Sequence, residues 1–244
     1  GNRVPTGLTL NQNVLDRLLR GDTQFAAPAL ETLSLTSRDA FNFYGNVSLD
    51  TLDAQTGVSK LQNLIFTTPA IYGLGESADV ASIRTANLIW NGASQHPGAV
   101  ITGGAGTGRG TLDIQAQRIE FGYGPNPQAS GLEQNNRLAL GFANVNLSAS
   151  ERITANHKGS LAVYQEQGAY DPVKGYVYSG GNLNLSTPLL TGEAASVNLL
   201  KAGNNLTLTG AGTPAAANAL GAELTLDARS VVLDSRITLA SGKL

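Results

Sequence analysis

The sequence predicts an all-β fold, in which short strands stack into a parallel β-solenoid. A short unit recurs along the chain, in which two apolar residues flank a polar one and small residues follow. Alternation over so few positions is typical of a strand that buries one face. Strands this short need several neighbours, and one turn of chain cannot bury its own apolar face. The repetition therefore predicts stacked turns that share a core.

The spacing of the unit favours a solenoid over a β-sandwich. The unit begins, in chain order, at Leu33, Leu112, Val145, Leu183, Leu206 and Leu224. From Leu112 onward, successive starts lie 33, 38, 23 and 18 residues apart. Sandwich strands pair through tight hairpins with turns such as Asn-Gly, whereas a near-regular return at about 20 residues is typical of parallel coils. The longer gaps hold Gly- and Tyr-rich stretches, which we interpret as insertions.

Asparagine accompanies the unit in the second half of the chain. It stands before or inside the unit at positions 144, 146, 182, 184, 204 and 205. Identical side chains on stacked strands can hydrogen-bond along the column. We therefore expect Asn ladders on the outside of the coils.

The composition restricts the partners. Of the 244 residues, 14% are charged, the formal net charge is −2, and Lys and Arg form no cluster. Nucleic acids and anionic membranes need such clusters, so neither is an expected partner. Cysteine is absent, which excludes disulfides and thiol chemistry and fits export through an oxidising compartment. Methionine is absent even at position 1 and no secretion signal opens the chain, so we expect an internal fragment.

We expect one β-helix segment over residues 1–244, with an edge or capping element at 1–30 and stacked coils at 31–244. The stretch "NQNVLDRLLRGD" predicts a short helix, with Asn13 as its cap and Gly21 as its stop. The stretch "TPAAANALGA" predicts a further helical turn that begins at Pro214.

A tyrosine cluster lies in the longest interruption of the repeat. Exposed tyrosines beside polar groups suit the recognition of carbohydrate or protein. The alternative is that the rings cover the side of the coils and keep the insertion folded. The candidate ligand-binding residues are Tyr164, Tyr170, Asp171, Lys174, Tyr176 and Tyr178.

Other motifs point to structure rather than chemistry. The glycines of "GGAGTGRG" (residues 103–110) match neither a phosphate loop nor a dinucleotide loop, and we interpret them as a connection between coils. His96 and His157 are the only histidines, so no metal site is expected. Trp90 is expected to pack inside a coil.

Two acidic pairs keep a glycan-cleaving enzyme open as an alternative. Such enzymes need paired carboxylates. Asp50 and Asp53 are typical of the edge of a coil, and Asp227 and Asp234 could stack on one face. We interpret both pairs as solvated surface residues.

The stretches from Asn136 to Tyr170 and from Tyr178 to Gly212 resemble the filamentous-haemagglutinin family. These are very large two-partner-secretion exoproteins of Gram-negative bacteria. The similarity covers residues 112–244 well and includes a region found late in contact-dependent growth-inhibition effectors of the CdiA type.

The resemblance implies a right-handed parallel β-helix that crosses the outer membrane through its transporter partner and is displayed on the cell surface. From the residues we expect a non-catalytic, monomeric segment without cofactor or metal, and the resemblance adds that it is secreted. Its expected role is adhesion to a receptor, protein or glycan, on a neighbouring cell, within an adhesin or a toxin-delivery filament. The alternatives are a passive spacer of the filament and the glycan-cleaving β-helix enzyme.

Overall fold

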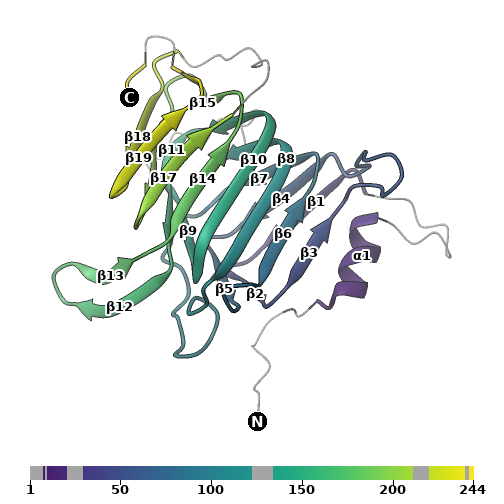
Figure 1. Ribbon diagram of the computed structural model, residues 1–244, viewed down its shortest axis with the longest axis horizontal. Coiled ribbons are helices and arrows are strands. Elements are labelled where there is room, and N and C mark those ends of the chain that lie inside the picture. The colour runs from purple at the N-terminus through teal and green to yellow at the C-terminus, as the bar shows by residue number, and fades with distance from the viewer. Residues whose placement is uncertain (1–7, 9, 21–29, 123–133, 211–219, 240–241) are drawn as a thin grey trace.

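The chain forms long parallel sheets, as the sequence predicts. The computed structural model describes residues 8, 10–20, 30–122, 134–210, 220–239 and 242–244. Within these ranges one helix accompanies twenty strands, and every strand pair of the two large sheets is parallel (Figure 1). An antiparallel hairpin of β12 (Glu166–Asp171) and β13 (Gly175–Ser179) projects from the side of the sheets.

The strands divide between the two large sheets. The twelve-stranded sheet contains β1 (Thr32–Thr36), β3 (Val47–Asp50), β4 (Asn63–Thr67), β6 (Val80–Arg84), β7 (Asn87–Trp90), β8 (Gly110–Phe121), β10 (Phe142–Ala155), β14 (Asn182–Ser186), β15 (Leu190–Gly192), β17 (Asn205–Thr209), β19 (Ser230–Asp234) and β20 (Ile237–Thr238). The six-stranded sheet contains β2 (Phe41–Tyr44), β5 (Ala70–Leu74), β9 (Asn135–Leu140), β11 (Lys158–Tyr164), β16 (Val197–Ala202) and β18 (Glu223–Asp227).

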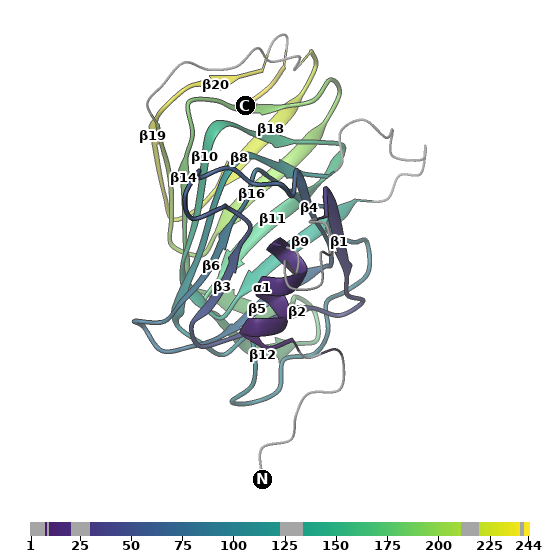
Figure 2. The same ribbon diagram turned by 90° about the vertical axis from the view of Figure 1, so that its right-hand side faces the viewer.

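The chain visits three rows of strands in turn (Figure 2). The first row is β3-β6-β8-β10-β14-β17-β19, and the second is β1-β4-β7-β8-β10-β15-β20. The third row is the six-stranded sheet. The long strands β8 and β10 serve two rows, because their first halves pair in the first row and their second halves in the second. This order of visits is consistent with a parallel β-helix.

The recurring unit forms the buried core. In the first row Leu112 pairs with Val145, Val145 with Leu183, and Leu183 with Leu206. Each of these side chains is at most 1% exposed. Burial of one such side chain stabilises the fold by about 1.5–3 kcal/mol. Trp90 is also buried, as predicted, and its Nε1 donates to the carbonyl oxygen of Thr68 at 2.9 Å.

One predicted repeat distance is wrong. Leu206 pairs with Val231 and not with Leu224, which lies in the six-stranded sheet opposite Asn198. Each turn of chain contributes strands to more than one row, so the same short pattern recurs on different sheets.

Asn ladders are confirmed on the outside of the first row. Asn182 Nδ2 donates to Asn144 Oδ1 at 3.0 Å, and Asn184 Nδ2 donates to Asn146 Oδ1 at 2.9 Å. In-register stacking aligns each amide with its copy, so donor meets acceptor without distortion.

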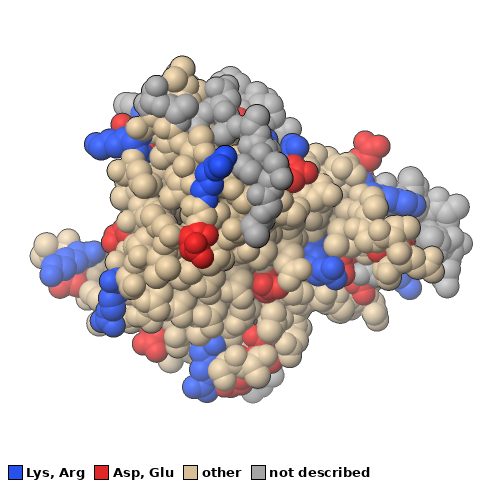
Figure 3. Space-filling model, turned by 45° about the horizontal axis from the view of Figure 1, so that its top comes forward, with Lys and Arg blue, Asp and Glu red and all other residues tan. Residues whose placement is uncertain are grey.

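The charged side chains are scattered over a largely uncharged surface (Figure 3).

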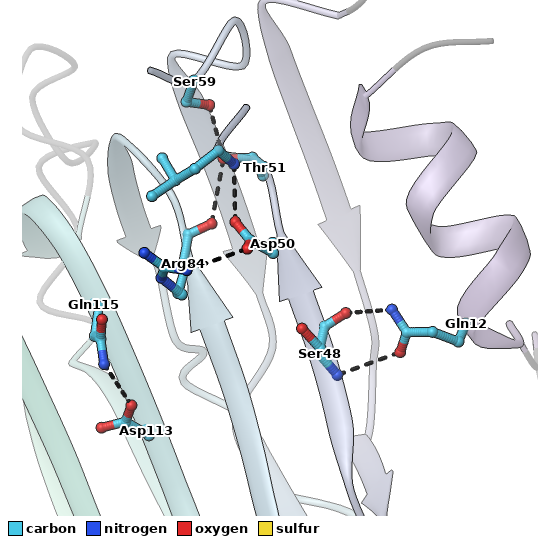
Figure 4. A network of polar contacts seen from close by, with 9 residues as sticks. Gln12, Ser48, Asp50, Thr51, Ser59, Arg84, Asp113 and Gln115 are labelled. Carbon is cyan, nitrogen blue, oxygen red and sulfur yellow. Dashed lines mark hydrogen bonds and ion pairs between the residues drawn. The ribbon is translucent and has the colours of Figure 1, made fainter. Parts of the chain in front are cut away.

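The predicted helix is confirmed as α1 (Gln12–Arg20), with Leu19 fully buried. Its cap is Asn11 rather than Asn13, because Asn11 Oδ1 accepts the Val14 N–H at 3.1 Å. The side-chain amide of Gln12 binds both the N–H and the carbonyl of Ser48 at the outer edge of β3 (Figure 4). A side chain thus takes the place of a neighbouring strand. Gly21 and the predicted turn at Pro214 lie outside the described residues.

The third row closes over a missing strand. After β7, which lies in the second row, residues 91–109 add no strand to the third row, and β5 pairs directly with β9. Arg137 holds this junction, although it is only 2% exposed. Its guanidinium donates to the carbonyl oxygens of Trp90, Asn91, Asn135 and Ser160. Burial lowers the pKa of Arg137 to about 9, so the group remains charged at neutral pH.

Replacing Arg137 should destabilise the fold strongly. Arg137→Met leaves several buried carbonyls without a donor, and hydrogen bonds to charged groups contribute about 1.5–3 kcal/mol each. We expect a loss of roughly 3 kcal/mol or more in urea unfolding. Arg109→Met is the control, because Arg109 pairs with Glu76 at the surface and should cost less than about 1 kcal/mol. Equal losses would contradict the role of Arg137.

Candidate functional site

The hairpin arises where the chain leaves the third row after β11. Strands β12 and β13 pair only with each other among the described strands. Their turn is fixed by Asp171, whose Oδ1 accepts the N–H groups of Val173 and Lys174 at 2.8 Å each. These two bonds, with that of Lys174 the larger, lower the pKa of the Asp171 carboxyl. Gly175 supplies the positive φ of 76° that closes the turn.

The predicted tyrosines are brought together along this hairpin. Tyr164 and Tyr178 stack with ring centres 5.0 Å apart and planes at 17°. Tyr178 and Tyr176 follow at 6.5 Å, and Tyr176 meets Tyr170 edge-on at 5.2 Å. Burial is the main cause that raises the pKa of Tyr164 and of Tyr178, so both phenols stay neutral at physiological pH. Lys174 and Asp171, the other candidates, lie at the tip of the hairpin.

The base of the hairpin rests on an apolar cluster outside the main core. The cluster contains Ala70, Tyr72, Leu138 and Leu140, with Tyr164 and Tyr178 packed against it. Val100 and Ala105, from residues 91–109, pack against the same cluster. Tyr72 donates its hydroxyl to the carbonyl oxygen of Gly98 at 2.7 Å, which fixes that segment to the sheet. Two insertions are therefore anchored at one place.

Both insertions expose apolar side chains. Val173 is 91% exposed, Ile101 75% and Tyr170 63%. Val177 and Tyr176 are exposed as well, and both segments project at the same lower edge in Figure 1. We call these five residues, Ile101, Tyr170, Val173, Tyr176 and Val177, the insertion surface. Sequence reasoning found its tyrosines from composition but missed Ile101, Val173 and Val177, which have no local signal.

The acidic residues Asp227 and Asp234 lie on different sheets. Asp227 is in the six-stranded sheet and Asp234 in the twelve-stranded sheet, so the two do not stack on one face. Asp227 pairs instead with Lys201 at 2.9 Å, and this bond is the largest cause that raises the pKa of Lys201.

The other pair is engaged in local structure. Asp50 binds Arg84 at 3.4 Å (Figure 4), while Asp53 accepts three hydrogen bonds from Gln55 and Thr56 within its own turn. The backbone bond from Thr56 is the largest of the causes that lower the pKa of Asp53.

The glycine-rich stretch serves as a connection, as predicted. The N–H groups of Gly106 and Gly108 both donate to the carbonyl oxygen of Gly73, at 2.8 and 3.1 Å. A Cβ on Gly108 would lie 2.7 Å from the backbone nitrogen of Gly75. Close backbone approach therefore explains a glycine there. In the described part of the chain, no set of His, Asp and Glu could hold a metal, and no helix is long and apolar enough to span a membrane.

A polar cluster on the second row was not anticipated. Glu120 pairs in register with Thr154, which is 6% exposed and whose Oγ1 has no hydrogen-bond partner. Asn156 Nδ2 approaches Glu120 Oε2 at 3.4 Å. Burial raises the pKa of the Glu120 carboxyl, and the nearby Arg152 opposes this rise. The sequence offers no signal for this cluster, because Glu120 stands between two buried residues, Ile119 and Phe121, as any outward strand residue would.

The chain matches no protein-family model, no curated protein and no solved structure.

Glu120→Gln should stabilise the protein at neutral pH. Because the native pKa of Glu120 is raised, the stability from its protonated form is present in acid and is lost as the pH rises through that pKa. The variant should therefore unfold at a higher temperature than the wild type at pH 7.5, with a smaller gain at pH 4. Glu76→Gln, at an exposed ion pair, is the control and should change little at either pH. A larger gain in unfolding temperature at pH 4 than at pH 7.5 would contradict the inferred effect of burial on Glu120.

Proposed function

We propose that the chain is a segment of a right-handed parallel β-helix in a secreted filamentous exoprotein, similar to filamentous haemagglutinin. In this proposal the segment reaches the surface of a Gram-negative bacterium through an outer-membrane two-partner transporter. Its insertion surface binds a receptor on a neighbouring cell. Adhesion and contact-dependent toxin delivery both require such a contact.

The tyrosine-lined hairpin is the observation that carries the proposal. In the first row, the outward positions of β10, β14 and β17 carry Asn, Ser and Thr in register. The hairpin instead exposes Tyr170, Val173 and Val177 away from the sheets. Exposed apolar and aromatic patches with few charges are typical of protein interaction sites.

The parallel rows support the part of the proposal in which the segment forms a stiff rod. Three rows that the chain visits in turn, each held in register by buried leucines, make a stiff body. Closure of these rows into a right-handed solenoid completes the proposal. Strands about 4.8 Å apart then extend the rod with each coil, and the insertions project from its side.

The alternatives have less support. A passive spacer needs only short corners, yet two insertions here expose apolar residues on a common anchor. A glycan-cleaving enzyme needs convergent carboxylates, yet Asp227 is paired with Lys201 and Asp53 is bound within a turn.

Cell binding tests the proposal. The purified 244-residue chain should bind Gram-negative bacterial cells, and the variant Tyr170→Ser, Val173→Ser, Tyr176→Ser should bind at least tenfold more weakly. Removal of an aromatic anchor that dominates an interface commonly weakens binding by far more than tenfold, so this threshold is a conservative one. Flow cytometry with labelled protein measures the effect, and thermal unfolding checks that the variant is folded.

Val58→Ser is the matched control, because Val58 is an exposed apolar residue in a different connection. It should bind as the wild type does. Undiminished binding by the triple variant would show that the insertion surface does not bind the receptor. No binding by the wild-type chain would favour the spacer.

A further inference from the structure

The outer edge of β13 is an unpaired strand edge that carries no charge. We propose that it accepts an extended polypeptide strand of the receptor, so that the hairpin becomes a three-stranded sheet. The inference rests on the proposed function and specifies the partner as protein rather than glycan.

The hairpin presents edges that no described strand covers. β12 and β13 form a sheet of two strands, and each pairs on one side only. Two strands alone are marginally stable in water. A third strand would bind the outward N–H and carbonyl groups of the edge and would cover part of the exposed apolar surface. Addition of a strand would therefore pair the free backbone groups of the edge and also cover exposed apolar surface.

The two edges of the hairpin differ. β13 reads Gly-Tyr-Val-Tyr-Ser, without a charge or a proline. β12 begins with Glu166, ends with Asp171, and is interrupted by a register shift between Gln167 and Tyr170. Charges and bulges are the features by which proteins protect edges from pairing. β12 is protected in this way, and β13 is not.

The edge of β3 shows how a side chain can protect a strand edge in this chain. The outer edge of β3 is occupied by the Gln12 side chain, which binds both backbone groups of Ser48. No side chain of the described residues binds the backbone of β13 in this way. The edge of β13 is therefore accessible for pairing.

The side chains favour a polypeptide over a sugar. Tyr164 and Tyr178 stack on each other at 17° and pack on the apolar cluster, so these two rings offer little open face to a sugar. The most exposed members beside the tyrosines are aliphatic: Val173 is 91% and Val177 53% exposed. Tyr176 and Tyr178 lie on one face of β13 and Val177 on the other. A partner strand with apolar residues opposite both faces fits this pattern.

Synthetic strands test the edge directly. The probes are short fluorescent peptides in which valine or tyrosine alternates with threonine. Besides the unmodified parent, each peptide is made in two N-methylated forms. One form is methylated at the odd-numbered amides and the other at the even-numbered amides. In an added strand only every second amide faces the protein. We expect the N-methylated form of one parity to lose binding at least tenfold, and the other to bind within about threefold of the parent. Fluorescence anisotropy with the full chain measures this.

Charged variants give an independent check. Val177→Lys places a charge on β13 and should weaken peptide binding at least tenfold, whereas Val58→Lys, at an exposed valine in a different connection, should change it little. Nuclear Overhauser contacts between Tyr164 and Tyr178 show that the hairpin of each variant remains folded. If Val177→Lys loses them, Ser179→Lys replaces it.

Several outcomes would overturn the inference. These are no peptide binding, equal effects of both N-methylated forms, binding of neutral oligosaccharides in place of peptides, or a dimer through β13 in sedimentation that Val177→Lys abolishes. If the wild-type chain still binds cells in any of these cases, the proposed function stands and only the strand-addition mechanism fails. Failure of cell binding itself would instead remove the proposed function.

Discussion

The structure depends on apolar strand faces that no single turn of chain can bury. Leu183 is fully buried only because Val145 lies on one side of it and Leu206 on the other, each in register. The same register aligns Asn182 with Asn144 and so forms the ladder outside. Because interior packing and exterior hydrogen bonds use one alignment, a slip of one residue would disrupt both.

This constraint also explains where function can be added. A turn of chain can leave a row if its neighbours close the gap, as β5 and β9 do beside residues 91–109. Arg137 then donates hydrogen bonds to the carbonyl oxygens of Trp90 and Asn91, which lie beside the missing strand. The segment that leaves is fixed outside by Tyr72 and by the apolar cluster shared with the hairpin. The rows thus hold the insertions in a defined place.

Short-range patterns predicted the long parallel sheets, the Asn ladders and α1, because alternation and caps depend on neighbours in sequence. They misplaced Leu224, since alternation shows that a residue is buried but not in which sheet. The tyrosines of the site were predictable because they cluster in one short stretch, from Tyr164 to Tyr178. The buried Arg137 was not, because its hydrogen-bond partners come from segments far apart in the chain.

Disulfide cross-linking tests the in-register stacking most directly, because the chain has no cysteine of its own. Ser148 and Ser186 are paired on adjacent strands of the first row, and Thr209 lies one strand beyond. Strands about 4.8 Å apart fall within disulfide range, whereas about 10 Å does not. The account predicts rapid oxidation of the Ser148→Cys, Ser186→Cys protein and none within one molecule of Ser148→Cys, Thr209→Cys. A cross-link in the second protein but not in the first would contradict it.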